Sequence, residues 1–388
     1  MELPIYLDHA ATTPVLPEVL EEMLPYFADV FANPATLYAS GLQAREAVEE
    51  ARETIAQALG ADASEIYFTS GGTESDNWAI KGMALASGDR RHLLTTPIEH
   101  HAVLDSCLAL EKQGYEVEFL PVDSEGFVDP EDVAQRIRPD TFLVSVMHAN
   151  NEVGTIEPIQ EIGKICHEKN VKFHSDGVQS FGNLPIIDVN QLHVDLLTLS
   201  AHKLYGPKGI GALYIRRGTR IARFMDGGEQ EKGRRAGTLN VPAIVGFGSA
   251  VRRMLIDHEA EARRLTDLRD RLIDGVLAEI PDARLSGPRK DRLPNNAHFC
   301  FGGVEGESLL LSLEMSGIYA SAGSACTAGS TEPSHVLLAM GVPVEWARGA
   351  LRMTLGRSTT AEAIDYTIER LAEVVQDLRR LRRVAVAG

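Results

Sequence analysis

A lysine placed directly after an apolar run is the residue best suited to covalent chemistry. The run Asp195–Lys203 is followed by a glycine-rich turn that ends at Gly211. A lysine at the end of a buried strand is desolvated, and desolvation lowers the pKa of an amine, so the free base can form an imine with a carbonyl. Ser200 and His202 add hydroxyl and N–H donors that suit a phosphate. Taken alone, a surface lysine after a strand is the commoner explanation of such a string.

A carboxylate upstream favours a functional lysine over a surface lysine. The segment 172–176 is a short apolar strand that ends in Asp176, which precedes Lys203 by 27 residues. This spacing allows one crossover and the next strand, so both side chains could meet at one ligand. Pyridoxal 5′-phosphate (PLP) needs an acidic partner for its pyridine nitrogen, because the protonated ring is the electron sink for a carbanion. The ordered pair therefore predicts a PLP site, although a single aspartate at a strand end is usually a turn former.

Two helix entries could complete such a site. In the strand–turn–helix segment 68–77, Gly72 and Thr73 would offer backbone N–H groups, a helix N-terminus and a hydroxyl to a phosphate. His100 follows a strand-like run at another helix entry, where an imidazole could lie flat against a pyridine ring. The adjacent His101 raises the alternative of a metal site. We expect no metal, because no Glu-x-x-His or His-x-x-x-His pattern accompanies the pair.

Cys326 lies in a stretch of small residues, 319–335, and the next helix is expected only near Ser334. This pattern predicts a long mobile loop, and such loops carry function more often than cores do. A structural free cysteine normally occupies apolar surroundings. The other three cysteines fit that description: Cys107, Cys166 and Cys300. Cys326 is therefore the candidate nucleophile.

Alternating strands and helices must position these residues. β-rich runs occur at Glu65–Thr69, Glu116–Pro121, Thr141–Met147, Val171–His174, Asp195–Leu199 and Gly211–Ile215. Helical patterns occur at Gly41–Leu59, Ser75–Ala86, Ala102–Gln113 and Ile159–Glu168. Strands separated by helix-length segments predict βαβ units and a doubly wound, mostly parallel α/β sheet. Ligands bind beyond the carboxyl ends of such strands.

The last third of the chain has a different pattern of expected helices and strands. A helix is expected from Thr238 to about His258, then a separate charged helix, strands near Asn296–Phe301 and Ala350–Leu355, and a final amphipathic helix after Thr359. We expect a large PLP-binding domain of residues 13–258. A smaller α+β domain, residues 1–12 and 259–388, would carry the loop of the candidate cysteine.

Composition limits the class of protein. Of the 388 residues 44% are hydrophobic and 24% charged, an ordinary globular balance. The formal net charge of −17 argues against general nucleic-acid binding, which needs clustered positive charge. There is no basic–apolar leader and no apolar stretch of about 18 residues, so neither secretion nor membrane association is expected. Four widely spaced cysteines without a C-x-x-C pair fit a reducing, cytoplasmic location.

Longer motifs resemble the cysteine desulfurases of the NifS/IscS type. They lie at 7–14, 148–154, 174–180, 200–203, 236–239 and 351–357, and the match runs in order from about residue 5 to about residue 370. The resemblance implies a fold-type I PLP-dependent transferase, normally a homodimer, that converts L-cysteine to L-alanine. Sulfur would pass to Cys326 as a persulfide, for delivery to an acceptor or iron–sulfur scaffold protein in cluster assembly or tRNA thiolation.

The same resemblance implies a role for each matching residue. Lys203 would hold PLP as an imine, Asp176 would pair with the pyridinium, and His100 would stack on the ring. The remaining cofactor contacts would be Asn151 and Gln179 to the phenolic oxygen, and Gly72, Thr73, Ser200 and His202 to the phosphate. Thr238 would reach the phosphate of the neighbouring subunit's cofactor. Arg352 would grip the substrate carboxylate, a task suited to its bidentate fork.

Three other functions remain open from sequence alone. A selenocysteine lyase shares this chemistry but needs less from the loop cysteine, because selenium leaves more easily. Another PLP-dependent, aminotransferase-like enzyme would share the fold without needing Cys326. A non-catalytic interaction subunit would need neither Lys203 nor Cys326, and the retention of both favours an enzyme.

Overall fold

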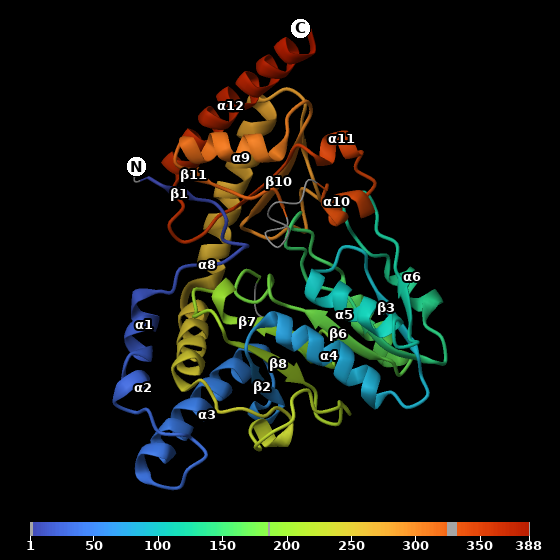
Figure 1. Cartoon of the computed structure of the whole chain (residues 1–388), viewed down its shortest axis with the longest axis vertical. Helices are drawn as coiled ribbons and strands as arrows, with labels where there is room; N and C mark the ends of the chain where they lie inside the picture. The colour runs from blue at the N-terminus through green and yellow to red at the C-terminus, as the bar shows by residue number, and fades with distance from the viewer. Residues whose placement is uncertain (1–2, 185–186, 324–331, 388) are drawn as a thin grey trace.

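A mostly parallel sheet forms the centre of the molecule, whose computed structural model describes residues 3–184, 187–323 and 332–387. Its seven strands follow the order β2-β8-β7-β6-β5-β3-β4 (Figure 1). Their bounds are β2 Ile66–Thr69, β3 His92–Thr95, β4 Glu116–Phe119, β5 Thr141–Ser145, β6 Lys172–Asp176, β7 Leu196–Ser200 and β8 Gly211–Ile215. Only β8 runs antiparallel to its neighbours, β2 and β7. The predicted doubly wound α/β fold is confirmed.

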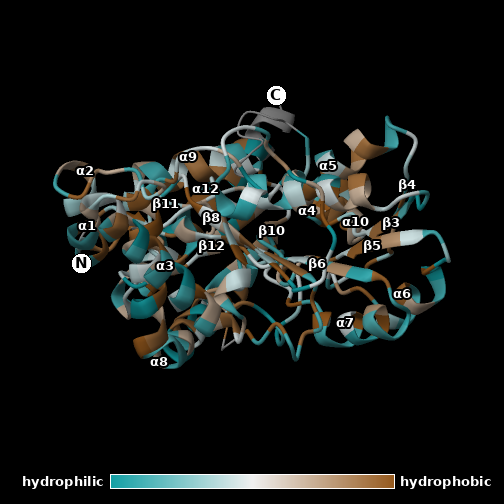
Figure 2. Ribbon diagram, turned by 90° about the horizontal axis from the view of Figure 1, so that it is seen from below, coloured by the Kyte–Doolittle hydropathy of each residue, from teal (hydrophilic) through white to brown (hydrophobic). Residues whose placement is uncertain are grey.

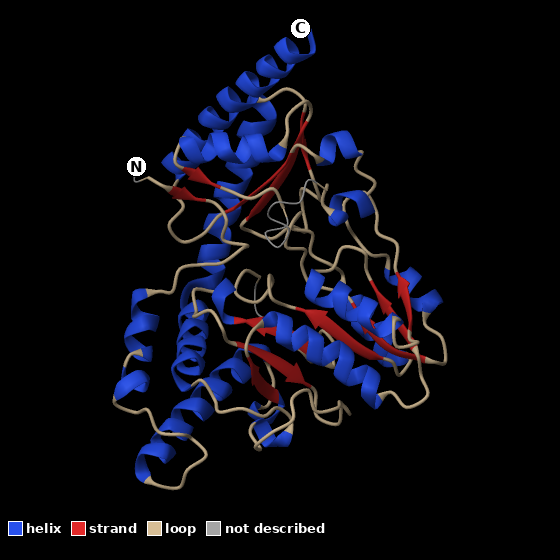
Figure 3. Cartoon of the chain, in the orientation of Figure 1, coloured by secondary structure: helices blue, strands red, loops and turns tan. Residues whose placement is uncertain are grey.

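Helices cover both faces of this sheet (Figure 3). One face packs against α4 and α5, and the other against α3, α7 and the first part of α8. The bounds are α3 Ala39–Leu59, α4 Gly72–Ala86, α5 His101–Glu111, α7 Ile159–Glu168 and α8 Val241–Glu279. Because side chains alternate along a strand, Leu196 of β7 joins the α4–α5 core while Leu197 joins the opposite one. Every residue of β7 is buried, which explains its near-continuous apolar run.

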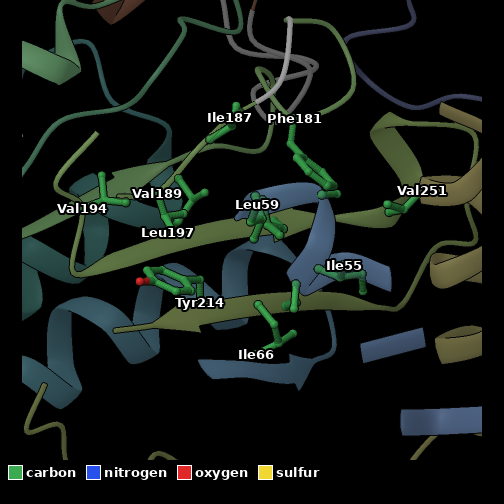
Figure 4. Close-up of a cluster of buried hydrophobic side chains, with 14 of the residues drawn as sticks. Ile55, Leu59, Ile66, Phe181, Ile187, Val189, Val194, Leu197, Tyr214 and Val251 are labelled. Carbon is green, nitrogen blue, oxygen red and sulfur yellow. The ribbon is translucent and has the colours of Figure 1, made fainter. Parts of the chain in front are cut away.

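The larger core is a contiguous apolar cluster beneath the site. Figure 4 shows Ile55 and Leu59 of α3 close to Leu197 of β7 and Tyr214 of β8. Figure 2 shows brown, hydrophobic residues along the strands and teal residues on the outer sides of the covering helices. A rigid sheet therefore holds the loops that follow its strands.

The smaller part of the molecule is built on two further sheets. In the first, β10 (Asn296–Phe301) pairs antiparallel with β12 (Ala350–Thr354) and β9 (Ala283–Leu285). In the second, β1 (Ile5–Tyr6) pairs in parallel with β11 (Ile318–Tyr319), which joins the N-terminus to this part. Helices α9 (Gly306–Met315) and α12 (Ala361–Ala387) complete it with the end of α8. The shorter elements are α1 Pro17–Met23, α2 Pro25–Ala28, α6 Pro130–Arg136, α10 His335–Ala339, α11 Val344–Ala347 and the 3₁₀ turns Ala63–Glu65, Ala201–Lys203 and Glu231–Gly233.

The single helix α8 replaces the two helices expected after Thr238, so that prediction is wrong. Its 39 residues run from the large core to the small one (yellow to orange in Figure 1). No glycine or proline interrupts residues 249–274, where good helix formers such as Ala, Glu, Arg and Leu prevail. Its buried residues join the large cluster up to Val251 and the small cluster from Leu265 onward. We propose that the domain boundary lies inside this helix, near residue 258.

No described helix combines the length and the apolar character that crossing a membrane requires.

Candidate active site

A cavity of about 240 Å³ opens at the carboxyl ends of β6 and β7. It brings together ten of the residues predicted from sequence: Gly72, Thr73, His100, Asn151, Asp176, Gln179, Ser200, His202, Lys203 and Arg352. Its wall also contains five residues that received no predicted role: Ala10, Ala11, Asp76, Met147 and Val178. The fold thus brings together residues that are up to 342 positions apart in sequence, at a site beyond the ends of parallel strands.

Lys203 closes the short 3₁₀ turn that follows β7. Its Nζ donates hydrogen bonds to the backbone carbonyls of Ala10 and Ala11, the latter at 2.7 Å. Gln179 donates from Nε2 to the same Ala10 carbonyl at 3.0 Å. The N-terminal segment therefore forms one wall of the cavity and holds the amine in place.

Asp176 is the last residue of β6, and its side chain is nearly enclosed. Its Oδ1 accepts a hydrogen bond from the backbone N–H of Val178 at 2.8 Å. Burial raises the pKa of this carboxyl to about 6, against the opposing effects of that hydrogen bond and of the charge on Lys203. A buried carboxylate of this kind favours a cationic partner.

A second carboxyl, Asp76 on α4, lies in the same wall and is 1% exposed. Burial, and next the charge of Asp176, raise its pKa well above the usual range. Its Oδ1 lies 3.6 Å from Nε2 of His174, whose own pKa burial lowers to about 3. Burial therefore favours the neutral forms of both Asp76 and His174. Asp176 is the carboxyl of the pair whose pKa the charge of Lys203 lowers. The sequence offered one signal for Asp76: its place one turn inside the helix that begins at Gly72.

The cavity wall also offers donors to an anion. Helix α4 begins at Gly72, where an added Cβ would meet Cγ2 of Val178 at 2.8 Å, so glycine is favoured. The N-terminus of that helix offers backbone N–H groups, and Thr73 and Ser200, which also line the cavity, carry hydroxyls. Burial lowers the pKa of His202 to about 4, so its neutral imidazole carries one N–H donor.

His100 is the N-cap of α5, and its Nδ1 accepts a hydrogen bond from the Ala102 N–H at 3.1 Å. Burial, and next the charge of Lys203, lower the pKa of this imidazole to about 4. The ring is thus neutral with its proton on Nε2, and it lines the cavity.

Arg352 lies at the centre of β12 and is 1% exposed. One terminal nitrogen donates to Oδ1 of Asp8 at 2.8 Å, and the other donates to the backbone carbonyl of Asn151 at 3.0 Å. The part of the molecule that contains β12 therefore presents a guanidinium to the cavity at the large sheet. Asp8, for which the sequence predicted no role, holds that guanidinium in place.

Two predicted site residues remain, Thr238 and Cys326. Thr238 is exposed in the loop before α8 and does not line the cavity. Cys326 belongs to residues 324–331, which are outside the described part of the chain. The other three cysteines are buried, and burial raises the pKa of each thiol: Cys107, Cys166 and Cys300. Within residues 3–184, 187–323 and 332–387, no group of three or more His, Cys, Asp or Glu side chains could hold a metal ion.

Comparison with known proteins identifies the family to which this chain belongs. The model of the class-V aminotransferases matches residues 5–367. The cysteine desulfurase IscS of Dictyoglomus turgidum is 52% identical over 382 residues, which cover 98% of this chain and 97% of the relative. That of Methanosarcina thermophila is 53% identical over 378 residues, covering 97% and 93%. The chain belongs to the class-V aminotransferases, among the cysteine desulfurases.

Solved structures agree with this assignment. A NifS-like protein that is 39% identical superposes with a TM-score of 0.91 and covers 97% of this chain and 100% of its own. SspA in complex with cysteine is 39% identical, with a TM-score of 0.81 and coverage of 90% and 98%.

PLP is the cofactor of this family, and the cavity fits it. Asp176 is a buried carboxylate that suits a protonated pyridine, and the N-terminus of α4 suits a phosphate. Lys203 lies in the same cavity as both, and the neutral imidazole of His100 lines its wall. The cavity lining thus contains both a carboxylate for the pyridine nitrogen and donors for the phosphate.

Proposed function

We propose that this cysteine desulfurase converts L-cysteine to L-alanine and that Cys326 receives the sulfur as a persulfide. The observation that carries the proposal is the convergence of Lys203, Asp176 and Arg352 on one cavity. A nucleophilic amine, a partner for a cationic ring and a fork for a carboxylate are the three groups that an amino-acid substrate on PLP requires. The persulfide would serve an acceptor or scaffold protein of iron–sulfur assembly in the cytoplasm.

PLP, when bound, supplies an electron sink that makes the Cα proton of an amino acid acidic. Lys203 would hold the carbonyl carbon of PLP, and Asp176 would pair with the pyridine nitrogen, while burial and the charge of Asp176 raise the pKa of Asp76. Gly72, Thr73, Ser200 and His202 would bind the phosphate. Asn151 and Gln179 would address the phenolic oxygen, and His100 would stack on the ring.

The protein side chains then carry out the proton and sulfur transfers. Arg352 orients the substrate carboxylate, with Asp8 balancing part of its charge. The free amine of Lys203 would accept the Cα proton. The thiolate of Cys326 attacks the substrate sulfur, the Cβ–S bond breaks, and Cβ receives a proton. The products are alanine and one persulfide on Cys326, so the atoms of cysteine are all accounted for.

An assay of the purified protein tests this function. With L-cysteine and a thiol reductant we expect equal amounts of alanine and sulfide. With L-selenocysteine as the only productive substrate the chain would instead be a selenocysteine lyase. Amino transfer from cysteine to a 2-oxo acid, without sulfide, would indicate an aminotransferase.

We also propose that the active enzyme is a homodimer in which Thr238 binds the phosphate of the neighbouring subunit's cofactor. Its exposure, and the fact that it is not among the residues that line the cavity of its own chain, support this role. A phosphate held by two subunits couples PLP binding to dimerisation by mass action. We expect Thr238→Ala to weaken PLP retention most strongly at low protein concentration, measured by light scattering and cofactor absorbance. A monomer fully loaded with PLP would contradict the shared site.

A further inference from the structure

An ion pair involves the first turn of α4, the helix proposed to bind the cofactor phosphate. Glu74 lies on that turn, two residues after Gly72, and Arg235 lies in the loop before α8. Nε of Arg235 donates to Oε1 of Glu74 at 2.8 Å, and Nη2 donates to Oε2 at 3.1 Å. The side chains of Arg235 and Glu74 are only 15% and 9% exposed. The pair is therefore bidentate and largely shielded from water, the arrangement in which an arginine fixes a carboxylate most specifically.

This pair determines where the negative charge of Glu74 lies. Oε2 of Glu74 also accepts a hydrogen bond from the backbone N–H of Ser70 at 2.9 Å. Ser70 precedes Gly71, the N-cap of α4, so the carboxylate reaches back past the start of the helix. Burial opposes the ionisation of Glu74, but the hydrogen bonds from Arg235 and Ser70 outweigh it and lower the pKa of this carboxyl. Glu74 is therefore an anion at neutral pH, with both oxygens engaged by Arg235 and Ser70.

A released carboxylate at this position would compete with a phosphate. Gly71 has no side-chain oxygen to occupy the N–H groups of the first turn, so those groups are available to a ligand. Glu74 is the third residue of the helix, and a glutamate there is attracted to the positive helix end and can bond to backbone N–H groups. It would also repel a second anion at the same helix end. The ion pair with Arg235 prevents both effects.

The loop that carries Arg235 is held in place by a separate contact. Four residues earlier, the buried carboxylate of Glu231 accepts hydrogen bonds from both terminal nitrogens of Arg52, at 2.7 and 2.9 Å. Glu231 also accepts from the backbone N–H of Phe68, in the edge strand β2, at 2.8 Å. These contacts fix the loop to the edge of the large sheet without the Arg235 side chain. Shortening Arg235 should therefore release Glu74 and leave the loop where it is.

We infer that Arg235 is a positioning residue for the cofactor phosphate: it holds the Glu74 carboxylate beside Ser70 and so keeps the start of α4 open to the phosphate. This role rests on the proposed phosphate site at Gly72 and Thr73. Arg235 acts through Glu74 and needs no contact with the cofactor. We therefore expect its loss to weaken the binding of ligands that carry a phosphate, and to leave binding through the ring and the aldehyde unchanged.

Titration of the apoenzyme with PLP and with pyridoxal, which lacks the phosphate, tests this role. The absorbance of the bound ligand gives a dissociation constant for each. For Arg235→Ala we expect the affinity for PLP to fall about ten-fold, because a free carboxylate at the helix end opposes the phosphate. The affinity for pyridoxal should not change. Arg235→Lys keeps the positive charge without the bidentate fork, so it should lose less affinity for PLP than Arg235→Ala.

Substitution of the partner residue distinguishes a released charge from a displaced loop. Glu74→Gln removes the charge and keeps an acceptor oxygen for Ser70, so this variant should bind PLP about as tightly as the wild type. Adding Glu74→Gln to Arg235→Ala should restore most of the lost affinity for PLP, because no free carboxylate remains. A displaced loop would instead move Thr238, and removing the charge of Glu74 would then restore nothing.

Arg138→Ala is the matched control. Arg138 also forms a bidentate pair with a glutamate, donating to the two carboxylate oxygens of Glu116 at 2.7 and 2.8 Å. Glu116 begins β4, the strand at the other edge of the large sheet, and neither residue lines the cavity. This variant should bind both PLP and pyridoxal with wild-type affinity.

The outcomes separate the positioning role from the proposed function. If the wild type binds PLP no more tightly than pyridoxal, the proposed phosphate site is wrong. If the wild type prefers PLP and Arg235→Ala keeps the same preference, the positioning role is wrong. That role is also wrong if Arg235→Ala weakens pyridoxal binding as much as PLP binding, or if the double variant binds PLP as poorly as Arg235→Ala alone.

Discussion

Cys326→Ala should lower alanine formation from L-cysteine by several orders of magnitude, because the loss of a covalent nucleophile removes the main route. None of the other thiols can replace it. Cys107, Cys166 and Cys300 are at most 2% exposed, and burial raises the pKa of each, so they remain protonated inside the cores. The variant should still bind cysteine and show an altered PLP spectrum, since Lys203 is unchanged.

Mass spectrometry after one turnover without reductant checks this prediction. Wild type should gain one sulfur on the peptide that contains Cys326. Alanine substitution of each buried cysteine should leave the rate near normal, apart from a packing cost of about 1 kcal/mol. A Cys326→Ala enzyme that desulfurates cysteine at the wild-type rate would refute the mechanism and favour a selenocysteine lyase.

Lys203→Ala should abolish turnover and the absorbance of covalently held PLP. The substitution removes both the group that holds the cofactor and the base proposed to accept the Cα proton. The helix N-terminus at Gly72 and the donors of Ser200 and His202 remain, so PLP should still bind non-covalently. Absorbance spectra before and after dialysis measure the difference.

Borohydride treatment of the wild type provides the matching positive result. Reduction should fix the cofactor to Lys203 and leave Lys208, five residues further on, unmodified. Peptide mapping that finds Lys203 unmodified in reduced wild type would overturn its assignment.

The strand ends that carry the site could be predicted because their signals are local. β8 and α7 have the predicted bounds, Gly211–Ile215 and Ile159–Glu168, and the other predicted strands end within a few residues of their observed limits. Asp176 and Lys203 follow apolar runs on neighbouring parallel strands, so sequence alone indicated that they meet. The short strand β3, at His92–Thr95, was indicated only as a strand-like run before His100, without bounds. A run of four residues is too short for its hydrophobic periodicity to distinguish a strand from the start of a helix.

Other parts of the site depend on contacts between distant segments. Asp8 and Arg352 are 344 residues apart, and neither shows in its own segment that they form an ion pair. Asp76 reads as an ordinary polar residue of a helix, and only the fold places it beside Asp176. The ion pair of Glu74 with Arg235 likewise joins a helix to a loop 161 residues away. Burial in the folded chain, rather than local pattern, gives these groups their properties.

The helix α8 has a thermodynamic consequence for the whole molecule. Its 39 residues extend for about 58 Å at 1.5 Å per residue. It supplies Ile244 and Phe247 to one apolar cluster and Leu272 and Ile273 to the other. Unfolding of either cluster would therefore remove packing contacts from a helix on which the other cluster also depends. The two halves should share one heat-absorption peak in calorimetry and melt as a single cooperative unit.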